Sequence, residues 1–282
     1  MFFILLHIVF SSFFVLCVRW TQRRNEDVKT VGAINYMVAA VGSAVIFLFQ
    51  SDAPITANSV LSGSVGGVFY FVTFLFLIVA AGWKGAANTT VVSRLSILVP
   101  IGCGAVLWNE WPGGWQLFAI GLACLALLLI GRKGNQLDKA KPPRFAGVLL
   151  VGFFVCGGCC RLAPEMFKNL CEPAEKSGFI LVLFGITALA SIVLLISRRH
   201  RPTKAEFTAG LAMGSANLAQ IFCMVAALQS YDGYIVFPMT AAGSLVFTTT
   251  IAVTMLDERP NKSSLAGVAI ATCALFLLYP QK

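Results

Sequence analysis

The chain contains nearly the same pattern twice, at an offset of 148 residues. An acidic corner between two apolar runs, residues 108–112 with Glu110 and Pro112, returns at residues 256–260 with Glu258 and Pro260. Without a gap, the same offset pairs further residues: Ala40 with Ala188, Ser43 with Ser191, Gly66 with Gly214, Phe74 with Phe222, Gly85 with Gly233, and Ser96 with Ser244. Matched corners, glycines and run boundaries over half a chain indicate duplication of an ancestral unit.

The composition places both copies in a lipid bilayer. Hydrophobic residues make up 58% of the 282 residues, charged residues only 12%, and the mean hydropathy is +0.83. So few polar side chains cannot cover the surface of a water-soluble protein of this length. The short connections between the apolar runs leave no room for a soluble domain of ordinary size.

Ten apolar runs are long enough to cross about 30 Å of hydrocarbon. They fall at roughly 2–19, 31–50, 60–81, 87–108, 115–131, 145–161, 178–197, 207–229, 235–256 and 264–280. We therefore expect an all-α integral membrane protein with ten transmembrane helices, as one five-helix repeat at 1–140 and another at 141–282. An odd number of spans per half places the second half in the opposite sense, and inverted repeats are typical of transporters.

Basic residues predict the orientation, because cytoplasmic loops are enriched in Lys and Arg. Sixteen basic residues fall in the loops after spans 1, 3, 5, 7 and 9, and four fall on the other side: Arg161, Lys168, Lys176 and Lys282. This count places both termini outside the cell membrane, and we expect a prokaryotic, multi-pass protein whose first span is retained rather than cleaved as a signal peptide. The net charge of +9 is spread over short loops, so it indicates topology and not nucleic-acid binding.

The residue types argue against several chemistries. The two histidines, His7 and His200, are far apart, and no convergent set of nucleophile, acid and base is evident, so we do not expect an enzyme. Eight of the nine cysteines lie in or beside apolar runs, where cysteine packs as a small hydrophobe, and no metal site is expected. No Walker-type loop occurs, so a gradient rather than this chain's own nucleotide hydrolysis would drive transport. No cofactor is expected.

The pattern resembles the drug/metabolite transporter superfamily, specifically its ten-span, EamA-like members. The resemblance covers nearly the whole chain and rests on the five-plus-five spans, on a fourth span with Ser96 and Pro100 that ends at Glu110, and on a ninth span with Ser244 that ends at Glu258. It implies a central substrate cavity lined by helices 1, 3, 4, 6, 8 and 9, with helices 5 and 10 at the periphery.

Two features depart from that family's pattern. Family members commonly keep both termini in the cytoplasm, whereas the charge count places them outside. The first corner carries Trp111 where the second carries Arg259.

Arg94 is the informative charge, because it lies about seven residues, or ~10 Å, into span 4. An arginine near a helix centre costs about 2.5–3.5 kcal/mol on insertion, so it needs a partner or an aqueous cavity. It is either an anchor for a carboxylate or phosphate, which guanidinium binds bidentately, or a side chain that snorkels or binds backbone carbonyls. Ser93, Ser96 and Pro100 extend a polar stripe beside it.

Other polar residues in spans are weaker candidates for substrate binding. Asn217 and Gln220 share one face of span 8 and serve either substrate recognition or interhelical hydrogen bonding. His7 is either a proton relay or a packed, hydrogen-bonded histidine. Tyr70 is a candidate for stacking on a substrate, whereas the tryptophans near span ends fit an interfacial belt.

Prolines and acids complete the candidates. Pro100 and Pro238 are candidate kinks or gates, because each removes a backbone hydrogen bond. Glu110, Pro112, Glu258 and Pro260 are expected to form structural corners at helix ends. We expect no other Asp or Glu inside a span, which argues against a proton/cation exchanger of the small-multidrug type.

The sequence thus predicts a secondary transporter that moves a small polar metabolite, such as an amino acid or organic anion, by alternating access. Its partners would be that solute and the lipid bilayer. A coupling proton or counter-solute and a homodimer are left open, as is the direction of transport. The alternatives are a carrier of neutral or cationic solutes and a non-transporting membrane subunit, scaffold or lipid-handling protein.

Overall fold

The computed structural model describes residues 1–50, 54–131, 146–198, 200–255 and 262–278, and all regular structure within these ranges is helical. The helices are α1 (Phe2–Arg23), α2 (Val28–Phe49), α3 (Ala57–Leu95), α4 (Leu98–Trp108), α5 (Gly114–Gly131), α6 (Ala146–Leu170), the short 3-10 turn η1 (Pro173–Glu175), α7 (Lys176–Arg198), α8 (Lys204–Leu228), α9 (Gly233–Met255) and α10 (Lys262–Leu278). Within α3, the side chains of residues 80–91 are not described.

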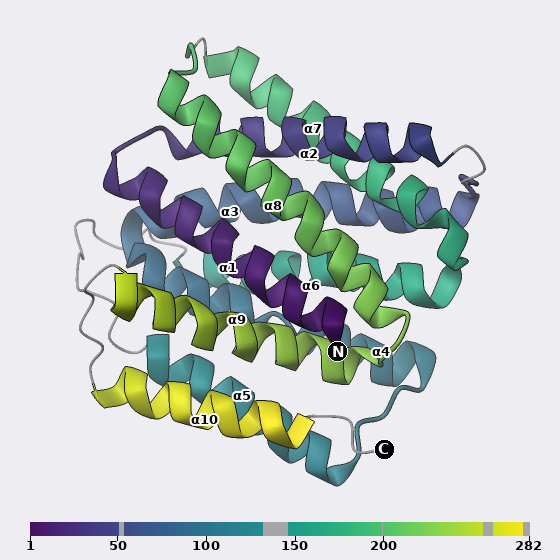
Figure 1. The fold of residues 1–282 in the computed structure, drawn as a ribbon, viewed down its shortest axis with the longest axis vertical. Coiled ribbons are helices and arrows are strands. Elements are labelled where there is room, and N and C mark those ends of the chain that lie inside the picture. The colour runs from purple at the N-terminus through teal and green to yellow at the C-terminus, as the bar shows by residue number, and fades with distance from the viewer. Residues whose placement is uncertain (51–53, 132–145, 199, 256–261, 279–282) are drawn as a thin grey trace.

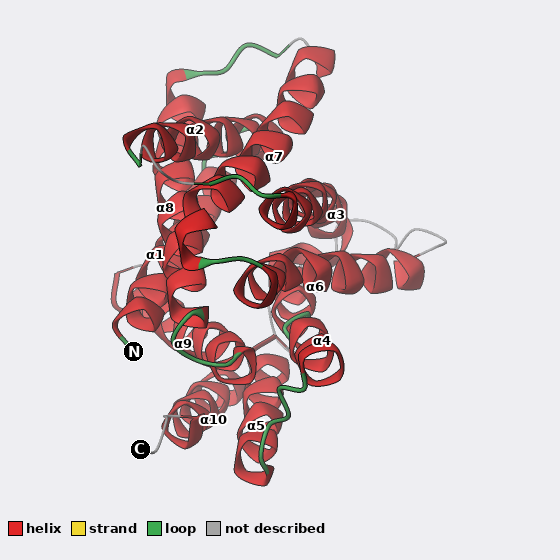
Figure 2. Cartoon of the chain, turned by 90° about the vertical axis from the view of Figure 1, so that its right-hand side faces the viewer, coloured by secondary structure: helices red, strands yellow, loops and turns green. Residues whose placement is uncertain are grey.

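The helices form a bundle in which α2 and α7 lie at one end and α5 and α10 pair at the other (Figures 1 and 2). Between these pairs, α1 packs against α8 and α9, and α3 packs against α6 and α7. Within the described residues, seven segments are long and apolar enough to cross a membrane, and three shorter apolar segments accompany them, at Val92–Trp108, Gly114–Leu129 and Leu265–Leu278. The chain is therefore an all-helical, multi-pass membrane protein.

The boundary between the two predicted spans at 60–81 and 87–108 differs from the prediction. The helical backbone continues from Ala57 to Leu95 and is interrupted at Ser96–Ile97, rather than near residue 84 as predicted. The chain nevertheless runs along α6 in both directions. α3 first passes from the end of α6, where Asn58 donates to the Leu170 carbonyl, to Gly152, which lies beside Phe76. The chain then returns from Ser96, beside Gly157, to Glu110, which pairs with Lys168. The chain therefore turns back within α3 (Figure 1).

The predicted end of span 6 at residue 161 was wrong. α6 continues through Pro164 to Leu170, so Arg161 and Glu165 lie inside an apolar helix rather than in an external loop. The two charged residues lower the hydropathy of this stretch. The helix continues through them because their side chains face the protein interior and not lipid. The expectation that no further acid lies in a span was wrong for the same reason, since the Glu165 side chain is 1% exposed.

Small residues allow the central helices to approach closely. A Cβ at Gly67 of α3 would lie 2.7 Å from the carbonyl oxygen of Leu183 in α7, and one at Gly214 of α8 would lie 2.6 Å from the carbonyl oxygen of Asn35 in α2. The Thr187 hydroxyl also donates to the Gly67 carbonyl at 3.1 Å. Close packing and polar contacts of this kind hold helices together in lipid, where apolar surface alone gives little driving force.

The contact of α3 with α7 predicts the effect of one methyl group. Gly67→Ala should lower the free energy of unfolding by about 1–3 kcal/mol, because the neighbouring group is backbone and cannot rotate away. Gly185→Ala in α7 is the matched control, since a Cβ there meets nothing within 4 Å and alanine favours a helix. Thermal unfolding of both variants in detergent checks this, and equal stabilities would contradict it.

Candidate functional site

A cavity of about 310 Å³ lies inside the bundle. It is lined by residues of α1, α2, α3, α6, α8 and α9, and by none from α5 or α10 among those described. The resemblance implied this peripheral place for helices 5 and 10, but it did not include the contribution of α2. Most of the sequence-predicted binding residues border the cavity: His7, Tyr70, Ser93, Arg94, Asn217 and Gln220.

Arg94 is almost completely buried, with 9% of its surface exposed. Its Nη1 donates to the carbonyl oxygen of Ala241 at 2.8 Å and to the hydroxyl of Ser244 at 2.7 Å, both on α9. Its Nε atom is buried and has no hydrogen-bond partner. One edge of the guanidinium is thus fixed by neutral acceptors, while a further donor lacks the acceptor that a buried N–H normally has.

Arg161 is a second arginine of the cavity that the sequence did not reveal. Its Nε donates to the hydroxyl of Ser96 at 3.2 Å, and its Nη2 donates to the carbonyl oxygen of Ser93 at 3.4 Å. It lies close enough to Arg94 for the two charges to repel. The loop count placed Arg161 outside the membrane, and this was wrong, because Arg161 lies in α6 and lines the cavity. Its Ser96 partner does not itself border the cavity but is completely buried behind it.

The acceptors of the two arginines are related by the sequence repeat. Arg161 binds the carbonyl of Ser93 and the hydroxyl of Ser96, while Arg94 binds the carbonyl of Ala241 and the hydroxyl of Ser244, each acceptor 148 residues further along the chain. The donors come from α3 and α6 and are not related in this way. Each half of the chain therefore supplies one serine hydroxyl and one backbone carbonyl that together bind a guanidinium. We call each such pair of acceptors a serine seat.

The amide candidates are hydrogen-bonded to one another. Asn217 Nδ2 donates to Asn35 Oδ1 at 3.3 Å, and Gln220 Nε2 donates to Asn217 Oδ1 at 2.8 Å. The His7 Nδ1 atom lies 2.8 Å from the Gln220 carbonyl oxygen. These contacts match the interhelical hydrogen bonding that the sequence left open as an alternative for Asn217, although all four residues also face the cavity. Tyr70 stacks edge-on against Phe184, with ring centroids 6.3 Å apart.

The cavity is therefore a positive site without a matching acid. Within the described residues, no carboxylate forms an ion pair with Arg94 or Arg161. Two cations in an apolar helical bundle are costly unless an anion or water accompanies them. The geometry suits a small anion that would complete the hydrogen bonding of both guanidinium groups.

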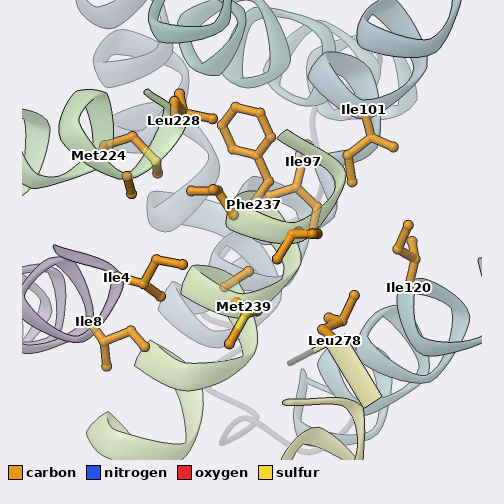
Figure 3. Close-up of a cluster of buried hydrophobic side chains, with 14 of the residues drawn as sticks. Ile4, Ile8, Ile97, Ile101, Ile120, Met224, Leu228, Phe237, Met239 and Leu278 are labelled. Carbon is orange, nitrogen blue, oxygen red and sulfur yellow. The ribbon is translucent and has the colours of Figure 1, made fainter. Parts of the chain in front are cut away.

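A cluster of buried apolar side chains adjoins the cavity. This closing cluster consists of residues on α1, α8 and α9 with neighbours from the α3–α4 junction, α4, α5 and α10: Ile4, Ile8, Ile97, Ile101, Ala119, Ile120, Met224, Ala227, Leu228, Ile235, Val236, Phe237, Met239, Ala241 and Leu278 (Figure 3). Of these, Met224, Phe237 and Ala241 also line the cavity. The cavity lining instead extends along α1 as far as Thr21 and reaches Val28 at the start of α2. The cavity lining therefore reaches toward the α1–α2 end, whereas the closing cluster includes Ile4 and Leu228, near the N-terminus and the α8–α9 corner.

The first predicted corner lies between α4 and α5, and the two candidate kink prolines lie at different positions within their helices. Glu110 follows Asn109, which has a left-handed backbone (φ 57°), and it forms an ion pair with Lys168 at 2.7 Å; Pro112 lies between α4 and α5. Pro100 lies in the first turn of α4, directly after the break at Ser96–Ile97, whereas Pro238 lies inside α9. Glu258 and Pro260 fall outside the described residues.

Comparisons with known proteins agree with this architecture. Residues 1–132 match the EamA-like transporter family. That family belongs to the drug/metabolite transporter superfamily. The match confirms the resemblance to this family, whose members are transporters, and the apolar helices make the chain a multi-pass membrane protein.

Two whole-length likenesses accompany the family match. An uncharacterized protein of Haemophilus influenzae is 23% identical over 271 residues, which cover 92% of this chain and 90% of that protein. A crystal structure superimposes with a TM-score of 0.77 at 15% identity, covering 99% of this chain and 95% of the other. At that identity the superposition shows a shared fold over nearly the whole length of both chains.

The seat of Arg94 predicts a stability difference between two serines. Ser244→Ala should lower the free energy of unfolding by about 1–3 kcal/mol, because it removes an acceptor from a buried charged donor. Ser215→Ala in α8 is the control. The exposed Ser215 hydroxyl donates to the Leu211 carbonyl four residues earlier, just as the Ser244 hydroxyl donates to the Thr240 carbonyl, but among the described residues Ser215 accepts no bond from an arginine. Thermal unfolding checks both, and equal losses would contradict the role of the seat.

Proposed function

We propose that the protein is a secondary transporter of a small anionic solute, such as an organic acid or a carboxylate-bearing metabolite, in the cell membrane of a prokaryote. The single observation that carries this proposal is the pair of cavity arginines without an acid partner among the described residues. A guanidinium pair supplies parallel N–H donors that match a carboxylate or phosphate. A cationic solute would instead face uncompensated repulsion.

The fold supports alternating access between two inverted five-helix repeats, residues 1–140 and 141–282. Contacts related by the repeat occur twice: α3 packs against α6 and α7, and α8 packs against α1 and α2. The cavity lies where the halves meet, and each half contributes one serine seat. Inverted repeats of this kind move around a site fixed near the middle of the membrane.

The extent of the cavity and the charge count together support a proposal about the state that this structure represents. The α1–α2 end, toward which the cavity extends, carries Arg24 and Lys29, and the charge count places that end in the cytoplasm. The closing cluster and the α4–α5 and α8–α9 corners lie at the other end, with the N-terminus. We propose that the structure represents an inward-facing state that is sealed on the outer side.

The anion proposal predicts the outcome of a ligand screen. Thermal shifts with carboxylates, phosphates, amino acids, sugars and lipophilic cations should identify an anionic solute that stabilises the folded protein. Arg94→Gln and Arg161→Gln should each weaken its binding by about tenfold or more, because each removes a charge-assisted contact. Arg201→Gln, at an exposed position before α8, is the matched control and should bind normally.

The screen also separates the alternatives. Stabilisation by neutral or cationic solutes that is unaffected in both cavity variants would discard the anion site and leave the arginines with a structural role. A panel without any shift would favour a scaffold or lipid-handling protein over a transporter.

A further inference from the structure

Glu165 is a buried acid that the anion site does not use. It follows Pro164 in α6, one turn beyond Arg161, and its side chain is 1% exposed. Both carboxylate oxygens are buried and have no hydrogen-bond partner. A Cβ at Gly233, the first residue of α9, would lie 2.6 Å from Glu165 Oε2, so the carboxyl group is pressed against the start of that helix.

The charges around Glu165 do not balance. The Lys168 ammonium lies 2.7 Å from Glu110, 3.2 Å from Asp232 and 3.7 Å from Glu165, so one cation faces three carboxyl groups from the α4–α5 corner, α6 and the α8–α9 corner. Further polar neighbours are Asn169 and the backbone N–H of Gly233, which donate to Glu110 at 3.5 and 3.4 Å, and Tyr234 beside Asp232. With all three acids ionised, this site would carry a net charge of −2 at the edge of the bilayer.

Other buried acids in the described chain show what an ionised carboxylate receives. Glu175 accepts hydrogen bonds from the Thr56 hydroxyl and from the backbone N–H of Glu172. Glu206 accepts from the backbone N–H groups of Asp27 and Thr203 and lies 3.1 Å from His200. Glu165 has no such donors, and leaving a buried charge without hydrogen bonds is strongly unfavourable.

We propose that Glu165 is a proton-binding site that holds its proton while the outer end of the cavity is closed. Protonation supplies a donor, because the Glu165 and Glu110 carboxyl groups both lie beside the Lys168 ammonium and Glu110 can accept. It also lowers the net charge of the site from −2 to −1. Lys168 then pairs with Glu110 and Asp232, which tie α6 to the α4–α5 and α8–α9 corners.

This site would make the proton the coupling ion. Opening the outer end separates the two corners from α6, admits water to Glu165 and releases one proton, whereas closing takes one up. The carboxyl group follows directly on the cavity residues Arg161 and Pro164, so solute and proton occupy adjacent parts of one helix. The inference concerns the closing of the cavity and does not depend on which solute is carried.

Infrared spectroscopy tests the proton directly. At neutral pH the wild-type protein should show one protonated carboxylic acid band, which titrates away only in alkaline solution, and Glu165→Gln should lack it. The control is Glu172→Gln, a substitution of an exposed acid at the same end of the molecule, which should keep the band. No band in wild type at neutral pH, or an unchanged band in Glu165→Gln, would overturn the proposal.

A second measurement tests the link to closure. Spin labels on the exposed Trp111 and Gln229 positions, in a cysteine-free background, report the separation of the two corners. Raising the pH should shift the wild-type protein toward the longer distance, by up to about tenfold in the equilibrium constant per pH unit for one linked proton. Glu165→Gln should stay at the short distance, because its amide is neutral and can donate to Glu110.

The outcomes are separable from those of the ligand screen. Equal pH responses in wild type and Glu165→Gln, or no response in wild type, would overturn the link to closure while leaving the anion proposal untouched. If Glu165→Gln fails to fold, the wild-type infrared titration and distance series still decide the question, because either can contradict the proposal without the variant.

Discussion

Two guanidinium groups held inside an apolar helical bundle determine most of what this protein can do. Neither Arg94 nor Arg161 has an acid partner in the described chain, so each depends on a serine hydroxyl and a backbone carbonyl of a neighbouring helix. Such seats require helices that approach closely and a cavity that admits water or an anion. The glycine contacts of α3 with α7 and of α8 with α2 provide the first requirement, and the central cavity provides the second.

The repeat explains why the site lies where it does. The acceptors at Ser93 and Ser96 and those at Ala241 and Ser244 stand 148 residues apart, which is the offset of the sequence repeat, whereas the arginines that they bind are not related by that offset. The acceptors thus follow the repeat and the two cations do not. A symmetric frame with an asymmetric pair of charges suits a solute that itself lacks symmetry.

Much of this could be predicted from the sequence, and the failures have two causes. The hydrophobic runs, the repeat and the position of Arg94 well inside a span could be read from the sequence, because lipid requires long apolar helices in which a charge is conspicuous. Arg161 and Glu165 were missed because hydropathy ends a span at charged residues, although a helix continues through them when they face the interior. The pairing of Glu110 with Lys168 was likewise not visible, since it depends on the turn of the chain within α3.

The native thiol of Cys160 offers the most direct measurement of the central claim, because it borders the cavity beside Arg161. In a protein whose other cysteines are replaced, its labelling rates with a sulfonate-bearing and a trimethylammonium-bearing methanethiosulfonate would be compared, each relative to the unfolded protein. Our account predicts that the anionic reagent reacts faster, and that this preference disappears when both arginines are replaced by glutamine. An equal or faster reaction with the cationic reagent would contradict an anion site in this cavity.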